Sequence, residues 1–79
     1  MNINERIAAR IRELREERKL TQEQLAWKGE LNRTSMNHIE NGRRNISTET
    51  LEKILNGLDV SFQDFFNAPL FQTTKKKKR

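Results

Sequence analysis

The chain has 79 residues and a formal net charge of +5, and it contains no cysteine. A chain of this length supports one domain with a modest core, and the lack of cysteine excludes disulfide frameworks and thiolate zinc sites. The N-terminal segment mixes arginine and glutamate among its apolar residues and has no run near the ~20 apolar residues of a membrane span. We therefore expect a cytoplasmic protein without a signal peptide.

The net positive charge comes from the C-terminal tail Lys75–Arg79, because residues 1–74 carry 11 basic and 11 acidic side chains. Such tails bind nucleic acid or stay solvated and disordered, and we expect residues 68–79 to form a flexible basic tail. In the rest of the chain, residues 1–46 hold ten basic and seven acidic groups, whereas residues 47–74 hold one and four. A binding surface for an acidic partner is therefore expected in the N-terminal half.

Two helices are expected before residue 30. Apolar residues recur at three- and four-residue spacing from Ile3 to Leu14, which predicts a helix over about residues 4–18. Thr21 and Gln24 have the spacing of a capping box, so a second helix begins there. This helix is about two turns long, because Gly29 interrupts its pattern.

A third helix follows closely. Asn32 is a good N-cap, Met36 and Ile39 form the apolar side, and the helix ends at Asn41 and Gly42, where glycine can adopt the left-handed conformation. Two short helices joined by a tight turn are the arrangement that presents one helix to the major groove of DNA. Helix lengths alone are equally consistent with a bundle used for protein contacts.

Two more helices complete the predicted fold. Ser47 caps a helix with an apolar stripe over Leu51–Leu58, which we expect to close near Gly57. Ser61 opens a short phenylalanine-rich helix, and no stable structure is expected beyond Pro69. No segment shows the alternation of apolar and polar residues that is typical of a β-strand. The sequence therefore predicts an all-α fold, a compact five-helix bundle, with residues 1–67 as its domain.

The outer face of the third helix indicates what the bundle binds. With Met36 and Ile39 inward, this face carries no carboxylate, and its side chains can hydrogen-bond to base edges or phosphates. Arginine pairs with guanine, asparagine pairs with adenine, and the threonine methyl contacts thymine. The expected base-reading residues are Arg33, Thr34, Asn37 and His38. Side chains at helix ends and in the adjoining loop suit phosphates: Gln22, Ser35, Asn41, Arg43, Arg44, Asn45 and Ser47.

Each of these assignments has a plainer alternative. The third-helix face can be a solvated surface, and a lone exposed histidine such as His38 is as often passive or phosphate-bound as base-reading. Without a second histidine or a cysteine nearby, His38 is not a metal site. Glu40 lies at the negative end of the helix dipole and needs a cationic partner, for which Arg15 is the candidate. The alternative is two unrelated surface charges.

The segments Thr21–Ala26 (TQEQLA) and Arg33–Gly42 (RTSMNHIENG) resemble the phage-repressor-like helix-turn-helix family over about residues 3–66. That resemblance implies a lambda-repressor-like DNA-binding domain, in which Gln22 binds a phosphate and the start of the third helix reads bases. It also implies a partly buried ion pair between Arg15 and Glu40.

Within that family, the chain looks most like the controller proteins of restriction–modification systems. The resemblance rests on Arg33–Thr34, on the run from Ile39 to Ser47, and on the segments Leu51–Ile54 and Val60–Phe66. It implies a short homodimer that binds paired operator sites, activating at low occupancy and repressing at high occupancy. An activator would also contact RNA polymerase, for which the acidic Glu49 and Glu52 are candidates.

Three positions depart from the family pattern. The turn usually has glycine or asparagine where Glu30 stands, and a left-handed glutamate there would cost roughly 1 kcal/mol. Controllers usually have an aromatic residue where Ser35 stands, so the DNA contacts made at that position are expected to differ from theirs. Trp27 stands where they often have tyrosine, and we expect it to cover the second helix, with a phosphate contact as the alternative.

A homodimer is expected because one recognition helix reads only a few base pairs. The apolar residues near the C-terminus exceed what two short helices need to cover the first helix. The candidate dimer interface is Leu55, Leu58, Val60, Phe62, Phe65 and Phe66, and the alternative is that all of them are core. Half-site centres would lie about 34 Å apart on a pseudo-palindromic operator.

Two other function classes remain open. A protein-interaction module, such as an antitoxin or a phage-type repressor partner, would use the same bundle without needing Arg33 or Asn37. Non-specific nucleic-acid binding through the tail would depend steeply on salt and on residues 75–79. Catalysis is not expected, because the sequence shows no paired carboxylates, no nucleophile beside a base and no phosphate-binding glycine loop. We also expect no cofactor, metal, membrane or small-molecule substrate.

Overall fold

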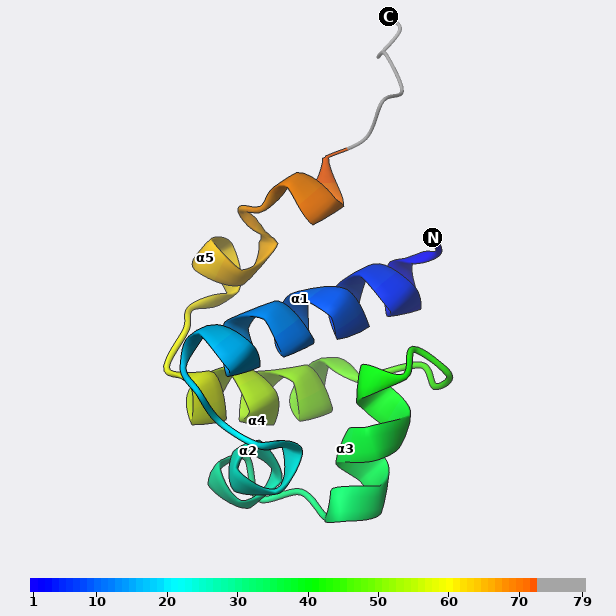
Figure 1. The fold of residues 1–79 in the computed structure, drawn as a ribbon. Coiled ribbons are helices and arrows are strands. Elements are labelled where there is room, and N and C mark those ends of the chain that lie inside the picture. Colours follow the sequence, from blue (N-terminus) through cyan, green and yellow to red (C-terminus); the bar gives the residue numbers. More distant parts are fainter. Residues whose placement is uncertain (73–79) are drawn as a thin grey trace, which may run out of the picture.

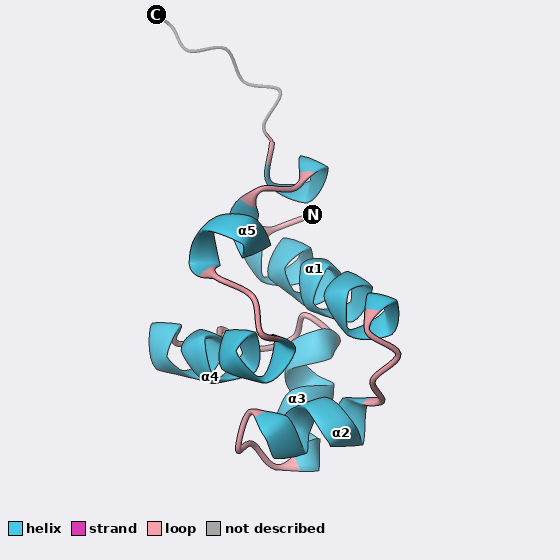
Figure 2. Cartoon of the chain, turned by 90° about the vertical axis from the view of Figure 1, so that its left-hand side faces the viewer, coloured by secondary structure: helices cyan, strands magenta, loops and turns pink. Residues whose placement is uncertain are grey.

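The computed structural model describes residues 1–72, and every regular element in this part of the chain is helical. In chain order these are α1 (Ile3–Glu17), α2 (Gln22–Lys28), α3 (Arg33–Glu40), α4 (Thr48–Leu58), α5 (Phe62–Phe66) and the 3₁₀ turn η1 (Pro69–Phe71). The predicted all-α, five-helix fold is confirmed. In both views α2 and α3 lie at one end of the molecule and α5 and η1 at the other, with α1 and α4 between (Figures 1 and 2).

Local side-chain caps place the helix starts. Thr21 and Gln24 form the predicted capping box, with Gln24 N donating to Thr21 Oγ1 at 3.0 Å and Thr21 N donating to Gln24 Oε1 at 2.8 Å. Asn32 caps α3, and its side-chain oxygen accepts from Ser35 N at 2.7 Å. An additional capping box at Asn2 and Glu5 starts α1 slightly before the predicted boundary.

One hydrophobic core joins all five helices. Its fully buried members are Ile11, Leu25, Met36, Ile54 and Phe65 among others, and α2 packs against both α3 and α4. This packing holds α3 at the surface with one side inward. The orientation of the helix pair is therefore set by the whole core and not by the connecting turn alone.

Two neighbouring residues, Gly29 and Glu30, shape the turn between α2 and α3. Glu30 takes the left-handed conformation at φ 60°, so the strain expected from the sequence is present. Gly29 has an ordinary φ of −90°, but a Cβ there would stand 3.0 Å from the Lys53 carbonyl oxygen of α4. Gly29 is therefore required by the close approach of α2 to α4.

The predicted end of α4 near Gly57 is confirmed, because the helix runs to Leu58 and ends on a left-handed Asp59. The other predicted end is wrong, because structure continues beyond Pro69, where we expected none. The η1 turn brings the Phe71 ring to 4.8 Å from the Phe66 ring, centre to centre, and Phe71 packs against the core. The apolar ring gains burial there, so the helical domain extends past residue 67. The basic segment 75–79 lies outside the described residues.

Three arginines of α1 donate hydrogen bonds to backbone carbonyl oxygens at the C-terminal ends of other helices. Arg10 Nε donates to Phe65 O at 2.8 Å, Arg18 Nε donates to Leu58 O at 2.8 Å, and Arg12 donates to Glu40 O. These carbonyls lie in the last turns of α5, α4 and α3, where backbone acceptors have no partner within the helix. Much of the positive charge counted in residues 1–46 therefore serves internal contacts, which sequence reasoning missed.

Candidate nucleic-acid interface

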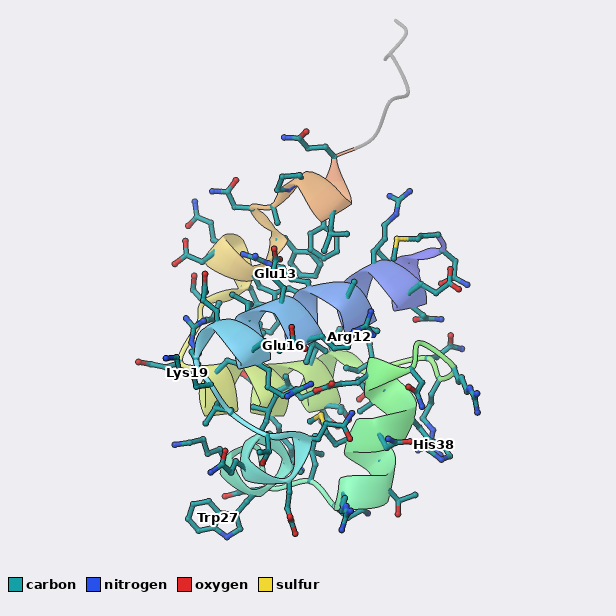
Figure 3. All side chains as sticks on the ribbon, in the orientation of Figure 1. Arg12, Glu13, Glu16, Lys19, Trp27 and His38 are labelled. Carbon is teal, nitrogen blue, oxygen red and sulfur yellow. The ribbon has the colours of Figure 1, made fainter. Side chains whose placement is uncertain are left out.

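The exposed side of α3 carries every residue that the sequence assigned to base reading. Arg33, Thr34, Asn37 and His38 are all exposed, whereas Met36 and Ile39 are buried. Figure 3 shows His38 pointing outward from α3, away from the bundle. The three-and-four periodicity of the two apolar residues thus orients the polar ones outward.

Gln22 joins this face from the first turn of α2. Together with the four candidate base readers of α3, it lines one hollow in the surface. The lining contains no carboxylate, because the one acidic residue of α3, Glu40, is buried. We call these five residues the recognition surface: Gln22, Arg33, Thr34, Asn37 and His38. Its chemistry suits a ligand rich in acceptors and negative charge.

A chain of hydrogen bonds runs from the core to this surface. Arg15 Nε donates to Glu40 Oε2 at 2.8 Å, and Gln22 Nε2 donates to Glu40 Oε1 at 3.2 Å. Gln22 Oε1 then accepts from Asn37 Nδ2 at 3.3 Å, and Asn37 Oδ1 accepts from Asn41 Nδ2 at 3.2 Å. The ion pair inferred between α1 and the end of α3 is therefore present, and it continues into the recognition surface.

The other members of the recognition surface have free side chains. Within residues 1–72, the guanidinium of Arg33, the hydroxyl of Thr34 and the imidazole of His38 make no side-chain hydrogen bond or ion pair. Arg33 is positioned only through its backbone, since the Asn32 cap fixes the start of α3. These groups can therefore bind a partner without first breaking an internal bond.

The candidate phosphate-binding residues form two groups. Gln22 and Asn41 belong to the hydrogen-bond chain beside the recognition surface. The remaining five are Ser35, Arg43, Arg44, Asn45 and Ser47, and all but Arg43 line a second hollow between α3 and the start of α4. Ser47 is already occupied as the α4 cap, because its Oγ accepts from Thr50 N at 3.0 Å. The exposed arginines of the loop are the strongest cationic groups in this second group.

The candidate dimer residues also divide, and three of the assignments are wrong. Leu55, Leu58 and Phe65 are buried in the core of one chain, so they cannot form a surface patch. Phe62 and Phe66 remain 43% and 38% exposed. On a five-residue helix the sequence pattern is consistent with either a core or an interface position for each of these residues. How α5 packs on α1 and α4 decides which of them face the core.

The expected role of Trp27 as a cover is also wrong. Its side chain is 80% exposed and extends from α2 away from the bundle (Figure 3). Leu25 and Ala26 already fill the inward side of α2. The next residue is turned by about 100° and faces outward.

Residues 1–72 offer neither a metal-binding cluster nor a membrane-spanning helix. No group of three or more histidine or acidic side chains there could hold a metal ion. No helix in the same part of the chain is long and apolar enough to cross a membrane.

Comparisons with known proteins bear on this interface. A family model described as helix-turn-helix matches residues 11–65. Control protein C.MunI of a Mycoplasma species is 39% identical over 67 residues, covering 84% of this chain and 90% of the relative. Control protein C.BamHI of Bacillus amyloliquefaciens is 32% identical, covering 98% of this chain and 96% of the relative.

Solved structures show the same likeness. The wild-type restriction–modification controller protein C.Esp1396I is 38% identical, with a TM-score of 0.80 over 84% of this chain and 85% of that chain. Another structure, also 38% identical with a TM-score of 0.80, holds the C.Esp1396I tetramer in complex with its natural 35 base-pair operator. It covers 84% of this chain and 87% of that one.

Proposed function

The chain belongs to the helix-turn-helix family and, within it, to the controller proteins of restriction–modification systems, and we propose that it binds operator DNA as a homodimer and regulates transcription. The likeness extends over most of the chain and over the fold. The proposed activity is recognition and not catalysis, and the place of action is the cytoplasm, where the DNA lies.

The observation that carries this proposal is the recognition surface. It presents exposed donors and acceptors, free of carboxylates, from the first turns of a helix that the core holds at the surface. Arg33 is suited to a bidentate pair with guanine, Asn37 to adenine and the Thr34 methyl group to thymine. His38 lines the same hollow and completes the proposed base-reading set.

Phosphate contacts would position this surface on the duplex. Gln22 and Asn41 flank the base readers, and the loop after α3 adds Arg43 and Arg44. Ser35, Asn45 and Ser47 line the adjoining hollow and are assigned to the same role. Contacts of this kind set register and affinity without reading sequence.

The proposed dimer contact lies at the end of the molecule opposite α2 and α3 (Figure 1). Phe62 and Phe66 expose aromatic surface there, next to the half-buried Val60. A symmetric contact through these residues would present two recognition surfaces, with half-site centres about 34 Å apart. The operator would then be pseudo-palindromic.

The proposed regulation is activation at low occupancy and repression at high occupancy of paired sites. For activation, the exposed carboxylates of Glu49 and Glu52 at the start of α4 are the proposed contact with RNA polymerase. Replacing both by alanine should abolish activation in a reporter assay and leave repression intact. Unchanged activation would remove these residues from the proposal.

The experiment that tests the function is selection of bound duplexes from a randomised pool at about physiological salt. Both the full chain and a version ending at Thr74 are used, because the second retains every described helix and lacks the basic segment. A two-fold symmetric motif from both is the expected result. No motif, or binding that vanishes with the tail, would contradict it.

A protein-interaction function is the second candidate, and the exposure of Trp27 favours it. Large aromatic side chains are enriched at protein interfaces. This function would survive Arg33→Ala and Asn37→Ala, whereas operator binding would not.

A further inference from the structure

Glu40 is buried, yet it touches a residue of the recognition surface. Its side chain is 0% exposed, and its two oxygens have different partners, Arg15 on Oε2 and Gln22 on Oε1. A carboxylate only accepts hydrogen bonds. The group of Gln22 that faces Glu40 must therefore be its NH₂, whichever way the amide is otherwise free to turn.

The orientation of the Gln22 amide in turn determines the orientation of the next amides in the chain, those of Asn37 and Asn41. With its NH₂ facing Glu40, Gln22 can offer only its oxygen to Asn37, and Asn37 Nδ2 donates to it at 3.3 Å. The NH₂ end of Asn37 is thereby fixed on the Gln22 side, so its oxygen faces Asn41 Nδ2 at 3.2 Å. Each amide has one donor end and one acceptor end, so the order of the first dictates the order of the next.

The starting point of this chain is rigid. Besides its bond to Glu40, Arg15 donates from Nη1 to the backbone oxygen of Leu20 at 2.7 Å, and its side chain is largely buried. The Arg15 guanidinium has only donors, so it too allows nothing but an acceptor on Glu40. Core packing therefore sets the orientation of Glu40, and Glu40 sets that of Gln22.

The donor–acceptor order of an asparagine decides which base edge it can pair with. Adenine presents an acceptor and a donor side by side in the major groove, and a reversed amide meets like groups instead. We propose that Glu40 is a specificity-determining positioning residue, which fixes the donor–acceptor order of Asn37 through Gln22 without touching DNA. This inference rests on the proposed function, in which Asn37 reads a base.

The substitution Glu40→Gln tests the chain directly because it keeps the size and shape of the side chain. The new amide keeps its oxygen toward Arg15, which can only donate, so its NH₂ faces Gln22. Gln22 must then turn its oxygen inward and its NH₂ outward, and Asn37 must turn in the same sense. The donor–acceptor order at the recognition surface is reversed.

Selection of bound duplexes from a randomised pool measures the effect of this reversal on the base preference at each operator position. Asn37→Ala first identifies the half-site position that loses its base preference. At that position, Glu40→Gln should lower the preference for the wild-type base by roughly 5- to 140-fold, the range of one bidentate contact. The preference at the position read by Arg33 should not change. An unchanged preference at the Asn37 position would overturn the inference.

Two variants separate positioning from a general structural effect. Glu16→Gln is the matched control, because it removes another carboxylate beside Arg15, at 4.0 Å, that is exposed and outside the chain of amides. It should leave every base preference unchanged. In a Gln22→Ala background, Glu40→Gln should cause no further change at the Asn37 position. A further change there would show that Glu40 acts by another route.

Gln22→Ala alone keeps the inference testable if Glu40→Gln does not fold. It releases Asn37 from the chain of amides, so the preference at the Asn37 position should fall, in addition to any uniform decrease in affinity from the missing phosphate ligand. A retained preference would overturn the inference. If the wild-type chain selects no motif, the proposed function itself fails, which is distinct from a motif that the variants leave intact.

Discussion

Removing the Arg33 side chain should weaken DNA binding strongly while leaving the fold intact. The Arg33 guanidinium is exposed and has no hydrogen-bond or ion-pair partner within residues 1–72, so Arg33→Ala should change the free energy of unfolding by less than about 0.5 kcal/mol. One bidentate arginine–guanine pair contributes about 1–3 kcal/mol. A dimer loses two pairs, so the dissociation constant should rise roughly 30- to 20,000-fold.

The assay is equilibrium binding to the selected operator at one fixed salt concentration, since affinity depends steeply on salt. Each protein is also measured on an operator in which the guanine assigned to Arg33 is replaced. Wild type should discriminate between the two duplexes, and the Arg33→Ala protein should not. Lys53→Ala is the control for loss of charge, because Lys53 is exposed on α4 and lines neither hollow. An Arg33→Ala protein that binds and discriminates as wild type does would refute the assignment.

Arg43→Ala should weaken binding equally on all sequences and reduce the slope of log affinity against log salt by about 0.9 for each phosphate that is no longer neutralised, measured by salt titration; a sequence-dependent decrease would contradict this. Phe65→Ala should cost about 3–5 kcal/mol in thermal unfolding because the ring is fully buried, whereas Phe62→Ala should weaken self-association in sedimentation with little loss of stability. A dimer unaffected by Phe62→Ala would argue for another interface. Glu30→Gly should raise the melting temperature by about 2–4 °C, because relief of ~1 kcal/mol of left-handed strain exceeds the added freedom of the unfolded chain. Gly29→Ala should lower the melting temperature because of the Lys53 carbonyl, and the opposite signs would show that the two residues have been assigned the wrong roles.

The sequence by itself determines the helices and the outward face of α3. Caps at Thr21, Asn32 and Ser47 each act on a backbone amide three residues away, so they can be identified without any knowledge of the rest of the fold. The spacing of Met36 and Ile39 likewise fixes which side of α3 is apolar, because helical geometry is local. The recognition surface follows from these two features, apart from its member on α2.

Only the tertiary structure decides contacts between segments that are distant in sequence. Phe65 is core and Phe62 is surface, although both fit the stripe of a short helix, because the way α5 lies on its neighbours selects one side. In the same way, Gly29 is needed because α2 lies so close to the Lys53 carbonyl of α4 that a side chain would not fit. Glu40 likewise accepts a hydrogen bond from Gln22, which is 18 residues away in sequence. The physical reason is common to all of these. Helix caps and periodicity depend on neighbouring residues, whereas burial and the direction of an amide depend on which remote group packs against them.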